Sequence, residues 1–276
     1  MIKTTGQEKL LEQLNKYTLA TLPKTLLFLG DKGCGKHTFI RNLCERLSLD
    51  TVIFKTNISD GLKEELRNQV QEATLKTTYC AYIIDLSELS SKDPMYQEIL
   101  LKFLEEPSET VYIMLIADSE MGIRPTILNR CVKCKFAPYT KEELLQATGR
   151  TINNDVILEI CKTPGQLEEI DTLTFDSLLD LCNKIVQSIK VASYANTMSL
   201  TTKIDTKDDY KKFDFDTFFN TLEYAAFEDF KKTSSETSFK VYLITNQFRQ
   251  ARINKTIIKS NFLANFFTQL WEGVRA

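Results

Sequence analysis

The chain has 276 residues, of which 43% are hydrophobic and 26% are charged, and its formal net charge at pH 7 is −2. This composition is typical of a globular protein with room for two or three domains. The small acidic excess argues against a free-standing nucleic-acid-binding domain, which would carry a basic excess. No apolar run has the length of a membrane span, and the first residues lack the apolar core of a signal peptide. We therefore expect a cytoplasmic protein without a membrane partner.

The first half of the chain alternates predicted strands with predicted helices. After an amphipathic segment at 10–17, which Pro23 ends, apolar runs predict strands at 25–29, 51–54, 80–85, 111–117 and 132–136. Helical spacing is found between them at 39–49, 61–75 and 95–105, with a short helix through 127–128. The alternation predicts an α/β fold with a doubly wound parallel sheet. We expect residues 111–117 at its centre, because they are almost wholly apolar.

From residue 140 onward the strand signal disappears and helical periodicity takes over. We expect short helices at 141–147 and 155–161, closed by Pro164-Gly165, and long helices at 175–198, 213–230 and 239–271. Residues 199–212 are polar and fit a loop or a weak helix. We expect domains at 1–137, 138–171 and 172–276. Most phenylalanines of the last domain fit its core, and some fit an interface with other chains.

The stretch after the first predicted strand has the pattern of a phosphate-binding loop. It reads Gly, four residues, Gly-Lys, between a strand and a helix, as the motif requires. Glycines let backbone N–H groups turn around an anion, and the helix N-terminus adds its dipole. The lysine would provide the charge for the β- and γ-phosphates. We therefore expect ATP or ADP to bind at Gly30, Asp31, Lys32, Gly33, Cys34, Gly35, Lys36, His37 and Thr38.

Two positions around this loop argue against efficient metal-assisted hydrolysis. The motif has Ser or Thr directly after the lysine as a Mg²⁺ ligand, whereas this chain has His37 there and Thr38 one residue later. A neutral imidazole suits Mg²⁺ poorly, so we expect His37 to face solvent or protein. Asp85 ends the third strand, where it would complete the site, but Leu86 follows in place of an acidic base. Glu88 is the next acidic residue.

The other reactive residue types indicate no further site. The seven cysteines are scattered and odd in number, which fits a reducing compartment rather than a disulfide framework. Cys131 and Cys134 form the one CxxC, but they lie on a predicted strand where residues three apart face opposite sides. With a single histidine in the chain, we expect no zinc site and no Ser-His-Asp chemistry.

Two further motifs carry a resemblance to a known family. Residues 100–107 read LLKFLEEP and closely resemble a run of bacterial clamp-loader subunits; residues 125–131 read PTILNRC and resemble their PTILSRC segment, with Asn129 for serine. The resemblance covers residues 1–137 strongly and the helical remainder in topology. Among these subunits the chain looks most like delta-prime of the DNA polymerase III holoenzyme, whose ATPase motifs are degraded. That resemblance implies an AAA+ module followed by a helical lid and a helical collar.

The resemblance also implies a role and partners. Arg130 would be an arginine finger that reaches a neighbouring subunit's ATP, where a guanidinium stabilises the transferring phosphoryl group. The partners would be gamma/tau and delta, the sliding clamp, and primer-template DNA through the assembled hetero-oligomer. Departures from the family are the missing four-cysteine zinc module after Leu49, Gln166 in place of the lid arginine, and Asp118 or Ser119 as the polar sensor.

Two other functions compete with this interpretation. An active ATPase motor subunit, for instance of a minimal or phage-type clamp loader, would need Thr38 to supply the hydroxyl and Glu88 or another acid to serve as base. A small-molecule P-loop kinase explains neither of the family motifs nor the helical half. We therefore expect an accessory clamp-loader subunit with weak or no hydrolysis of its own.

Overall fold

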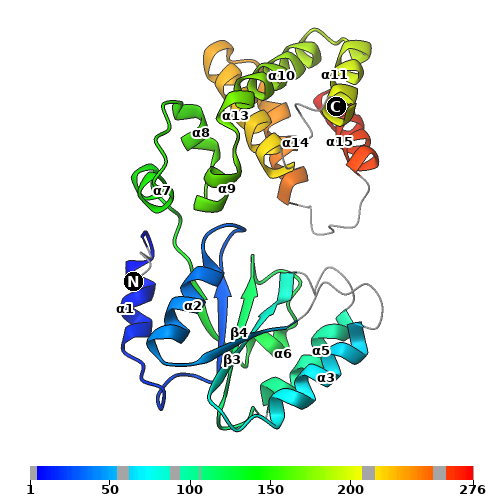
Figure 1. Ribbon diagram of the computed structural model, residues 1–276. Coiled ribbons are helices and arrows are strands. Elements are labelled where there is room, and N and C mark those ends of the chain that lie inside the picture. The colour runs from blue at the N-terminus through cyan, green and yellow to red at the C-terminus, as the bar shows by residue number, and fades with distance from the viewer. Residues whose placement is uncertain are drawn as a thin grey trace. The chain divides into compact units, whose positions relative to one another are not determined.

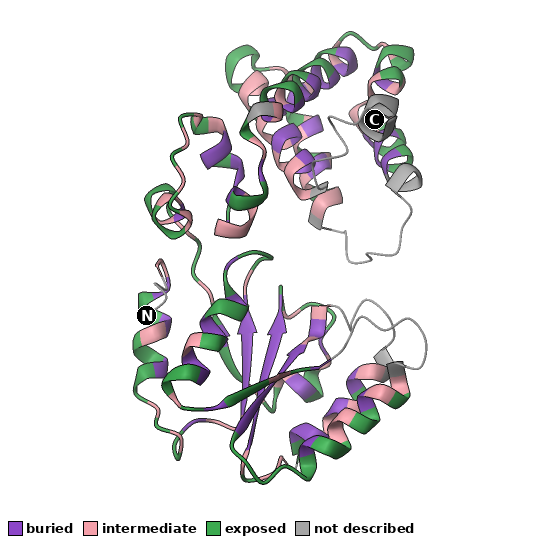
Figure 2. Ribbon diagram, in the orientation of Figure 1, coloured by how far each residue is buried: buried purple, intermediate pink, exposed green. Residues whose placement is uncertain are grey.

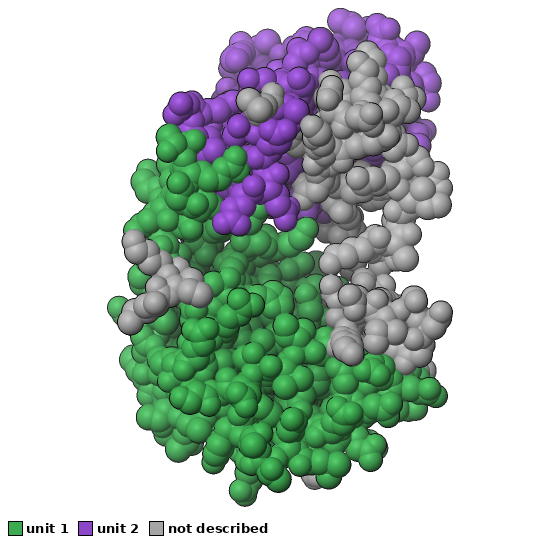
Figure 3. Space-filling model, in the orientation of Figure 1, with its two compact units in different colours: residues 1–151, 162–165 green, residues 152–161, 166–276 purple. Residues whose placement is uncertain are grey.

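A computed structural model of the chain describes residues 5–54, 62–87, 94–105, 107–206, 215–250 and 259–275. The chain forms two compact units, one of residues 1–151 with 162–165 and one of residues 152–161 with 166–276 (Figure 3). The division into three domains at residues 138 and 172 stays a prediction.

The first unit is built on a five-stranded sheet in the order β2-β3-β4-β1-β5, and all neighbouring strands are parallel. The sequence prediction of a parallel α/β fold is confirmed. Every side chain of β4 is buried, and β4 lies in the middle of the sheet as its apolar sequence predicts. In chain order the strands are β1 (Thr25–Leu29), β2 (Asp50–Ile53), β3 (Cys80–Asp85), β4 (Val111–Ala117) and β5 (Val132–Lys135).

Helices cover both faces of this sheet, as Figure 1 shows. One face carries α1 (Glu8–Asn15) and α2 (Lys36–Arg46), and the other carries α3 (Leu62–Thr74), α5 (Pro94–Glu105) and α6 (Pro125–Leu128). Alternate residues of β1 serve the two faces: Leu26 and Phe28 pack toward α2, whereas Leu27 and Leu29 pack toward α5. The buried interior of the sheet is visible in Figure 2.

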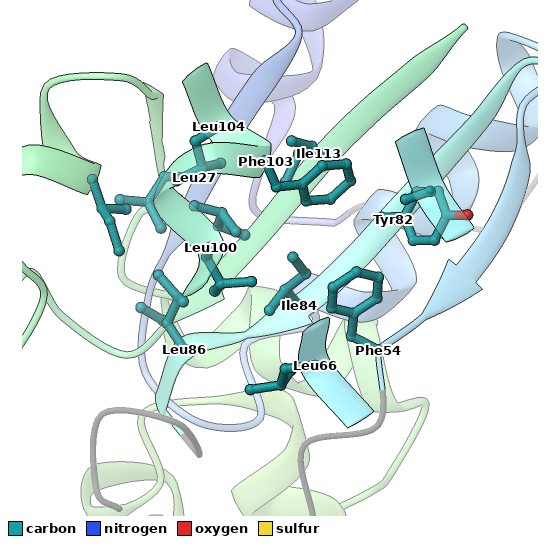
Figure 4. Packing of buried hydrophobic residues seen from close by; sticks show 14 of the residues in the cluster. Leu27, Phe54, Leu66, Tyr82, Ile84, Leu86, Leu100, Phe103, Leu104 and Ile113 are labelled. Atoms are coloured by element: carbon teal, nitrogen blue, oxygen red, sulfur yellow. The ribbon is translucent and has the colours of Figure 1, made fainter. Parts of the chain in front are cut away.

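The α3/α5 face has an aromatic core, drawn in Figure 4. The rings of Phe54, Tyr82 and Phe103 lie 5.2 to 5.9 Å apart between centroids, and two of the three pairs meet edge to face. Leu66 of α3 and Leu100 of α5 are fully buried beside them. This packing fixes α5, and α5 in turn holds the segment around α6.

The chain leaves the sheet through a short helix, α7 (Lys141–Thr148), which belongs to the first unit. Thr140 and Glu143 form a reciprocal capping box at its start. The next helices are α8 (Asp155–Ile160) and α9 (Pro164–Glu169). The expectation that Pro164 and Gly165 close a helix is wrong, because Pro164 is the first residue of α9. Proline suits this position, where a missing N–H leaves no helical hydrogen bond unmade.

The second unit is helical, as predicted. Its long helices are α10 (Thr172–Lys190), α11 (Tyr194–Thr206), α13 (Phe215–Thr233), α14 (Glu236–Gln250) and α15 (Lys259–Arg275). The predicted single helix at 175–198 is wrong. It breaks at Ala192, whose φ of +58° is left-handed, and the Ser193 N–H closes the turn on the Ser188 carbonyl. Within the described residues, none of the helices combines the length and the apolar character that crossing a membrane requires.

Phenylalanines form the core of the second unit. Phe219 and Phe266 meet edge to face with centroids 4.9 Å apart, and Phe267 lies 4.9 Å from Phe266. Phe227 and Phe239 are instead more than one third exposed. The expected core phenylalanines are therefore present, whereas an interface of others with a second chain stays a prediction; Phe213 lies outside the described residues.

A polar network also joins the helices of this unit. The Asp229 carboxylate accepts hydrogen bonds from Lys190 Nζ (2.7 Å), Gln187 Nε2 (2.8 Å) and Ser238 Oγ (2.5 Å). Although its partial burial opposes ionisation, these donors hold the pKa of Asp229 below its usual value. The network fastens α10, α13 and α14 to one another.

Candidate functional site

The predicted phosphate-binding loop lies between β1 and α2, at the carboxyl end of the sheet. Gly33 and Gly35 have φ angles of +83° and +88°, which only glycine adopts without strain. Gly35 is the N-terminal cap of α2, so the loop runs directly into the positive end of that helix. The local conformation is therefore the one that the glycine pattern predicts.

Three successive carbonyl groups of the loop are bound from outside it. The Tyr139 hydroxyl donates to the Cys34 carbonyl (2.8 Å), the Thr163 hydroxyl donates to the Lys32 carbonyl (2.9 Å), and the Gly165 N–H donates to the Gly33 carbonyl (2.9 Å). In a planar trans peptide the N–H points opposite to the C=O. These contacts therefore turn the loop's carbonyls outward, which suits a loop whose N–H groups bind an anion.

The Tyr139 and Cys34 side chains remain protonated in this setting. Burial raises the pKa of Tyr139 to about 12, so its hydroxyl keeps the proton that it donates to the loop. Burial also raises the pKa of the Cys34 thiol to about 11. Cys34 is thus a packing residue of the loop and not an activated nucleophile.

Lys36 is turned back onto the protein. Its ammonium donates to the Gly30 carbonyl, to the Asp31 carbonyl (3.2 Å) and to Asp118 Oδ1 (3.0 Å). An ammonium has three N–H donors, and these three acceptors satisfy all of them. The Lys36 side chain is only 7% exposed, whereas that of Asp118 is 46% exposed. A phosphate that binds here must displace a carboxylate from the lysine.

A chain of hydrogen bonds connects this ion pair to the end of β3. The Asp118 N–H donates to the Ser87 hydroxyl oxygen (3.1 Å), and the Ser87 N–H donates to Asp85 Oδ1 (2.8 Å). The carboxyl ends of β3 and β4 and the loop therefore meet at one place, as expected for parallel strands. Asp85 lies in this region as predicted. Asp118, named from the sequence only as a weak sensor candidate, provides the carboxylate that forms the ion pair with Lys36.

The residues after the lysine do not fit a Mg²⁺ ion. His37 and Thr38 both lie on the outer first turn of α2 with exposed side chains. His37 occupies the place of the metal-binding hydroxyl, and an imidazole is a poor ligand for a hard cation. The loop fits the phosphates of a nucleotide, but this donor set does not fit the metal. Glu88, the candidate base of the motor alternative, lies outside the described residues.

Arg130 stands apart from the loop, between α6 and β5. Its Nη2 donates to Glu105 Oε1 (2.7 Å) and its Nη1 donates to the Thr126 carbonyl (2.8 Å). The side chain is 37% exposed, so the guanidinium is at the surface while two of its nitrogens are held. Glu105 is the last residue of α5, the helix that contains most of the LLKFLEEP run.

Sequence reasoning missed the residues that surround the loop. Tyr139, Thr163 and Gly165 lie 105 to 132 positions after the loop residues that they contact, and they make these contacts through hydroxyl and backbone groups that belong to no sequence motif. Ser87 follows the predicted strand end by two residues, and its place beside Asp85 could have been inferred from that spacing. Glu105 belongs to a recognised motif, but the motif alone assigns it no partner.

The fold and the loop together define a class of protein. A parallel sheet in the order β2-β3-β4-β1-β5, with a P-loop after β1 and helices following the sheet, is the AAA+ form of the P-loop fold. The crystal structure of a DNA polymerase III gamma subunit-related protein from Thermotoga maritima has the same fold, with a TM-score of 0.52 and 14% sequence identity. The match covers 98% of this chain and all of that one.

Sequence comparisons narrow the class. Residues 53–140 match the family model described as DNA polymerase III, delta subunit. DNA polymerase III subunit tau of Escherichia coli is 25% identical over 232 residues, which is 74% of this chain and 35% of tau. Probable replication factor C subunit 5 of Dictyostelium discoideum is 24% identical over 195 residues, 65% of this chain and 53% of that protein.

The chain thus has the AAA+ form of the P-loop fold and is similar in sequence to clamp-loader subunits. It spans about a third of the length of the tau subunits that it matches.

Proposed function

We propose that this chain is a delta-prime-like subunit of a DNA polymerase III clamp loader. It would assemble with gamma/tau and delta, help them place the sliding clamp on primer-template DNA, and donate Arg130 to a neighbouring subunit's ATP. Its own loop would bind ATP or ADP weakly and hydrolyse it slowly or not at all. The lid and collar boundaries at 138–171 and 172–276 belong to the same proposal.

The observation that carries this proposal is that the Lys36 ammonium is already bound by the protein itself. Its ammonium has three protein acceptors, one of them the Asp118 carboxylate. An incoming γ-phosphate competes with that carboxylate, and the adjacent His37 offers no hydroxyl for a metal. A module with these features is poorly suited to its own hydrolysis, while its exposed arginine is available to another subunit.

Arg130 has the properties that a trans-acting arginine needs. It is exposed, it lies in the PTILNRC segment, and packing of α5 and α6 on the sheet fixes the backbone around it. Ile127 of α6 is fully buried in that core. A guanidinium delivered from a rigid neighbouring element stabilises the charge on a transferring phosphoryl group.

The test is ATP turnover by cognate gamma/tau with delta, to which wild-type protein or its Arg130→Ala variant is added. We expect wild type to stimulate turnover, and the variant to enter the assembly without stimulating it. The matched control is Arg124→Ala, because Arg124 lies at the opposite end of α6, its N-terminal end, and forms a similar ion pair with Glu98. Equal stimulation by wild type and Arg130→Ala would refute the arginine-finger role; failure of the wild type to join the assembly would refute the subunit role.

The second candidate is an ATPase motor subunit of a minimal or phage-type clamp loader. The loop geometry favours it, because the positive φ angles and outward carbonyls of a phosphate cradle are intact. In this case the purified chain would hydrolyse ATP alone, Lys36→Ala would abolish that turnover, and Arg130→Ala would leave the turnover of its partners unchanged.

A further inference from the structure

The segment that bears Arg130 is fastened to α5 by two similar ion pairs. Arg124 Nη1 lies 2.5 Å from Glu98 Oε1, and Arg130 Nη2 lies 2.7 Å from Glu105 Oε1. Glu98 and Glu105 are seven residues apart and so lie on the same face of α5, two turns apart. The four side chains have similar exposed fractions, from 37% to 53%. The two pairs bracket α6 at its two ends.

The two pairs differ in how completely the arginine is held. The Arg130 guanidinium also donates through Nη1 to the Thr126 carbonyl, one helical turn earlier (2.8 Å). Both of its terminal nitrogens are therefore held, one by a side chain and one by the backbone of α6. A planar guanidinium with both ends held has a defined orientation as well as a defined position.

This arrangement leaves the guanidinium able to act. Arginine has five N–H donors, and the contacts with Glu105 and Thr126 use two of them. Three donors remain to meet the oxygens of an anion without release of either contact. A long, flexible side chain loses much rotamer entropy when it is fixed, and here much of that loss occurs within the subunit, before any partner arrives.

We propose that Glu105 is a positioning residue for Arg130: its carboxylate, together with the Thr126 carbonyl, orients the guanidinium toward the terminal phosphate of a nucleoside triphosphate bound by a neighbouring subunit. This inference rests on the proposed arginine-finger function. It gives Glu105 of the LLKFLEEP run a chemical role and couples that run to the PTILNRC segment.

The experiment measures ATP turnover by gamma/tau with delta at saturating amounts of this subunit, with Glu105→Ala, Glu105→Gln and the matched control Glu98→Ala. We expect Glu105→Ala to lower kcat about three- to fivefold, the effect of losing one exposed ion pair, and to leave KM for ATP unchanged, because the finger acts on the transition state. The glutamine variant keeps an acceptor oxygen and should retain most of the turnover. Glu98→Ala should resemble wild type.

A double variant provides the second readout. If Glu105 acts through Arg130, Glu105→Ala should have no further effect when it is combined with Arg130→Ala. Additive losses would overturn the inference. Equal kcat values for Glu105→Ala and Glu98→Ala would also overturn the inference. If Arg130→Ala nevertheless stops stimulation, the proposed arginine-finger function would stand without a role for Glu105.

Two remaining outcomes also decide the matter. If Arg130→Ala stimulates like wild type, the proposed function fails and this inference fails with it. If Glu105→Ala does not enter the assembly whereas Glu105→Gln does, Glu105 belongs to a subunit interface, and the positioning role is refuted.

Discussion

Replacing Asp118 by asparagine removes the negative charge beside Lys36 and keeps the shape of the side chain. Two unit charges 3.0 Å apart attract by about 1.4 kcal/mol in water and about 5.5 kcal/mol at an effective dielectric constant of 20. The Asp118 side chain is 46% exposed, so the lower figure is the appropriate one. A phosphate would no longer compete with this attraction. We therefore expect Asp118→Asn to bind ADP about tenfold more tightly than wild type.

The assay is titration of a fluorescent ADP analogue at low ionic strength, repeated at higher salt, where the gain should shrink because exposed charges are screened. Asp31→Asn is the matched control, because Asp31 is an exposed loop carboxylate that contacts Lys36 through its backbone carbonyl. Combining Asp118→Asn with Lys36→Ala should remove the gain. Equal affinities for Asp118→Asn and Asp31→Asn would show that the loop responds to net charge alone and would refute the competition argument.

Three further substitutions test the structure around the loop and in the second unit. Tyr139→Phe should lower the free energy of unfolding by about 1 kcal/mol in urea titrations. It should also weaken the alkaline loss of stability: burial raises the pKa of Tyr139 in the folded chain to about 12, above the ordinary tyrosine value of about 10, so its contribution is present below pH 10 and is lost as pH rises toward 12. Gly165→Ala would place a Cβ 2.7 Å from loop backbone and should cost about 1–3 kcal/mol, seen as a lower melting temperature; an unchanged value would contradict the close approach. Asp229→Ala leaves a half-buried lysine without its carboxylate and should cost about 2–3 kcal/mol. Asp180→Ala, which removes an exposed i,i+4 pair, should cost under about 0.5 kcal/mol, and equal losses for these two variants would argue against the Asp229 network.

The sheet could be predicted from the sequence because its signals are local. The strands β1, β3 and β4 are short, mostly apolar runs, each followed by a helix with its own periodicity, and β4 is central because its sequence is almost wholly apolar. The break of the long helix at Ala192 could not be predicted. Alanine is a strong helix former, and its left-handed conformation is imposed by the turn between α10 and α11.

The candidate site was predictable only in part, for a related reason. The glycines and Lys36 predict the loop because the chain must turn tightly at that place. The side-chain acceptor of Lys36 lies just after the end of another strand, β4, and from the sequence either Asp118 or Ser119 could have provided it. That choice depends on the relative register of β1 and β4, which has no signature in either segment.

The pairing of β1 with β5 sets the position of Arg130 along the chain. Val132 lies opposite Leu26 in the sheet, so Arg130 precedes the first paired residue of β5 by two positions. One inserted residue between them would shift the chain by about 3.3 Å and exchange its inward and outward side chains. The residues that contact Arg130 can therefore change through evolution or engineering, whereas the number of residues between Arg130 and β5 has little freedom to change.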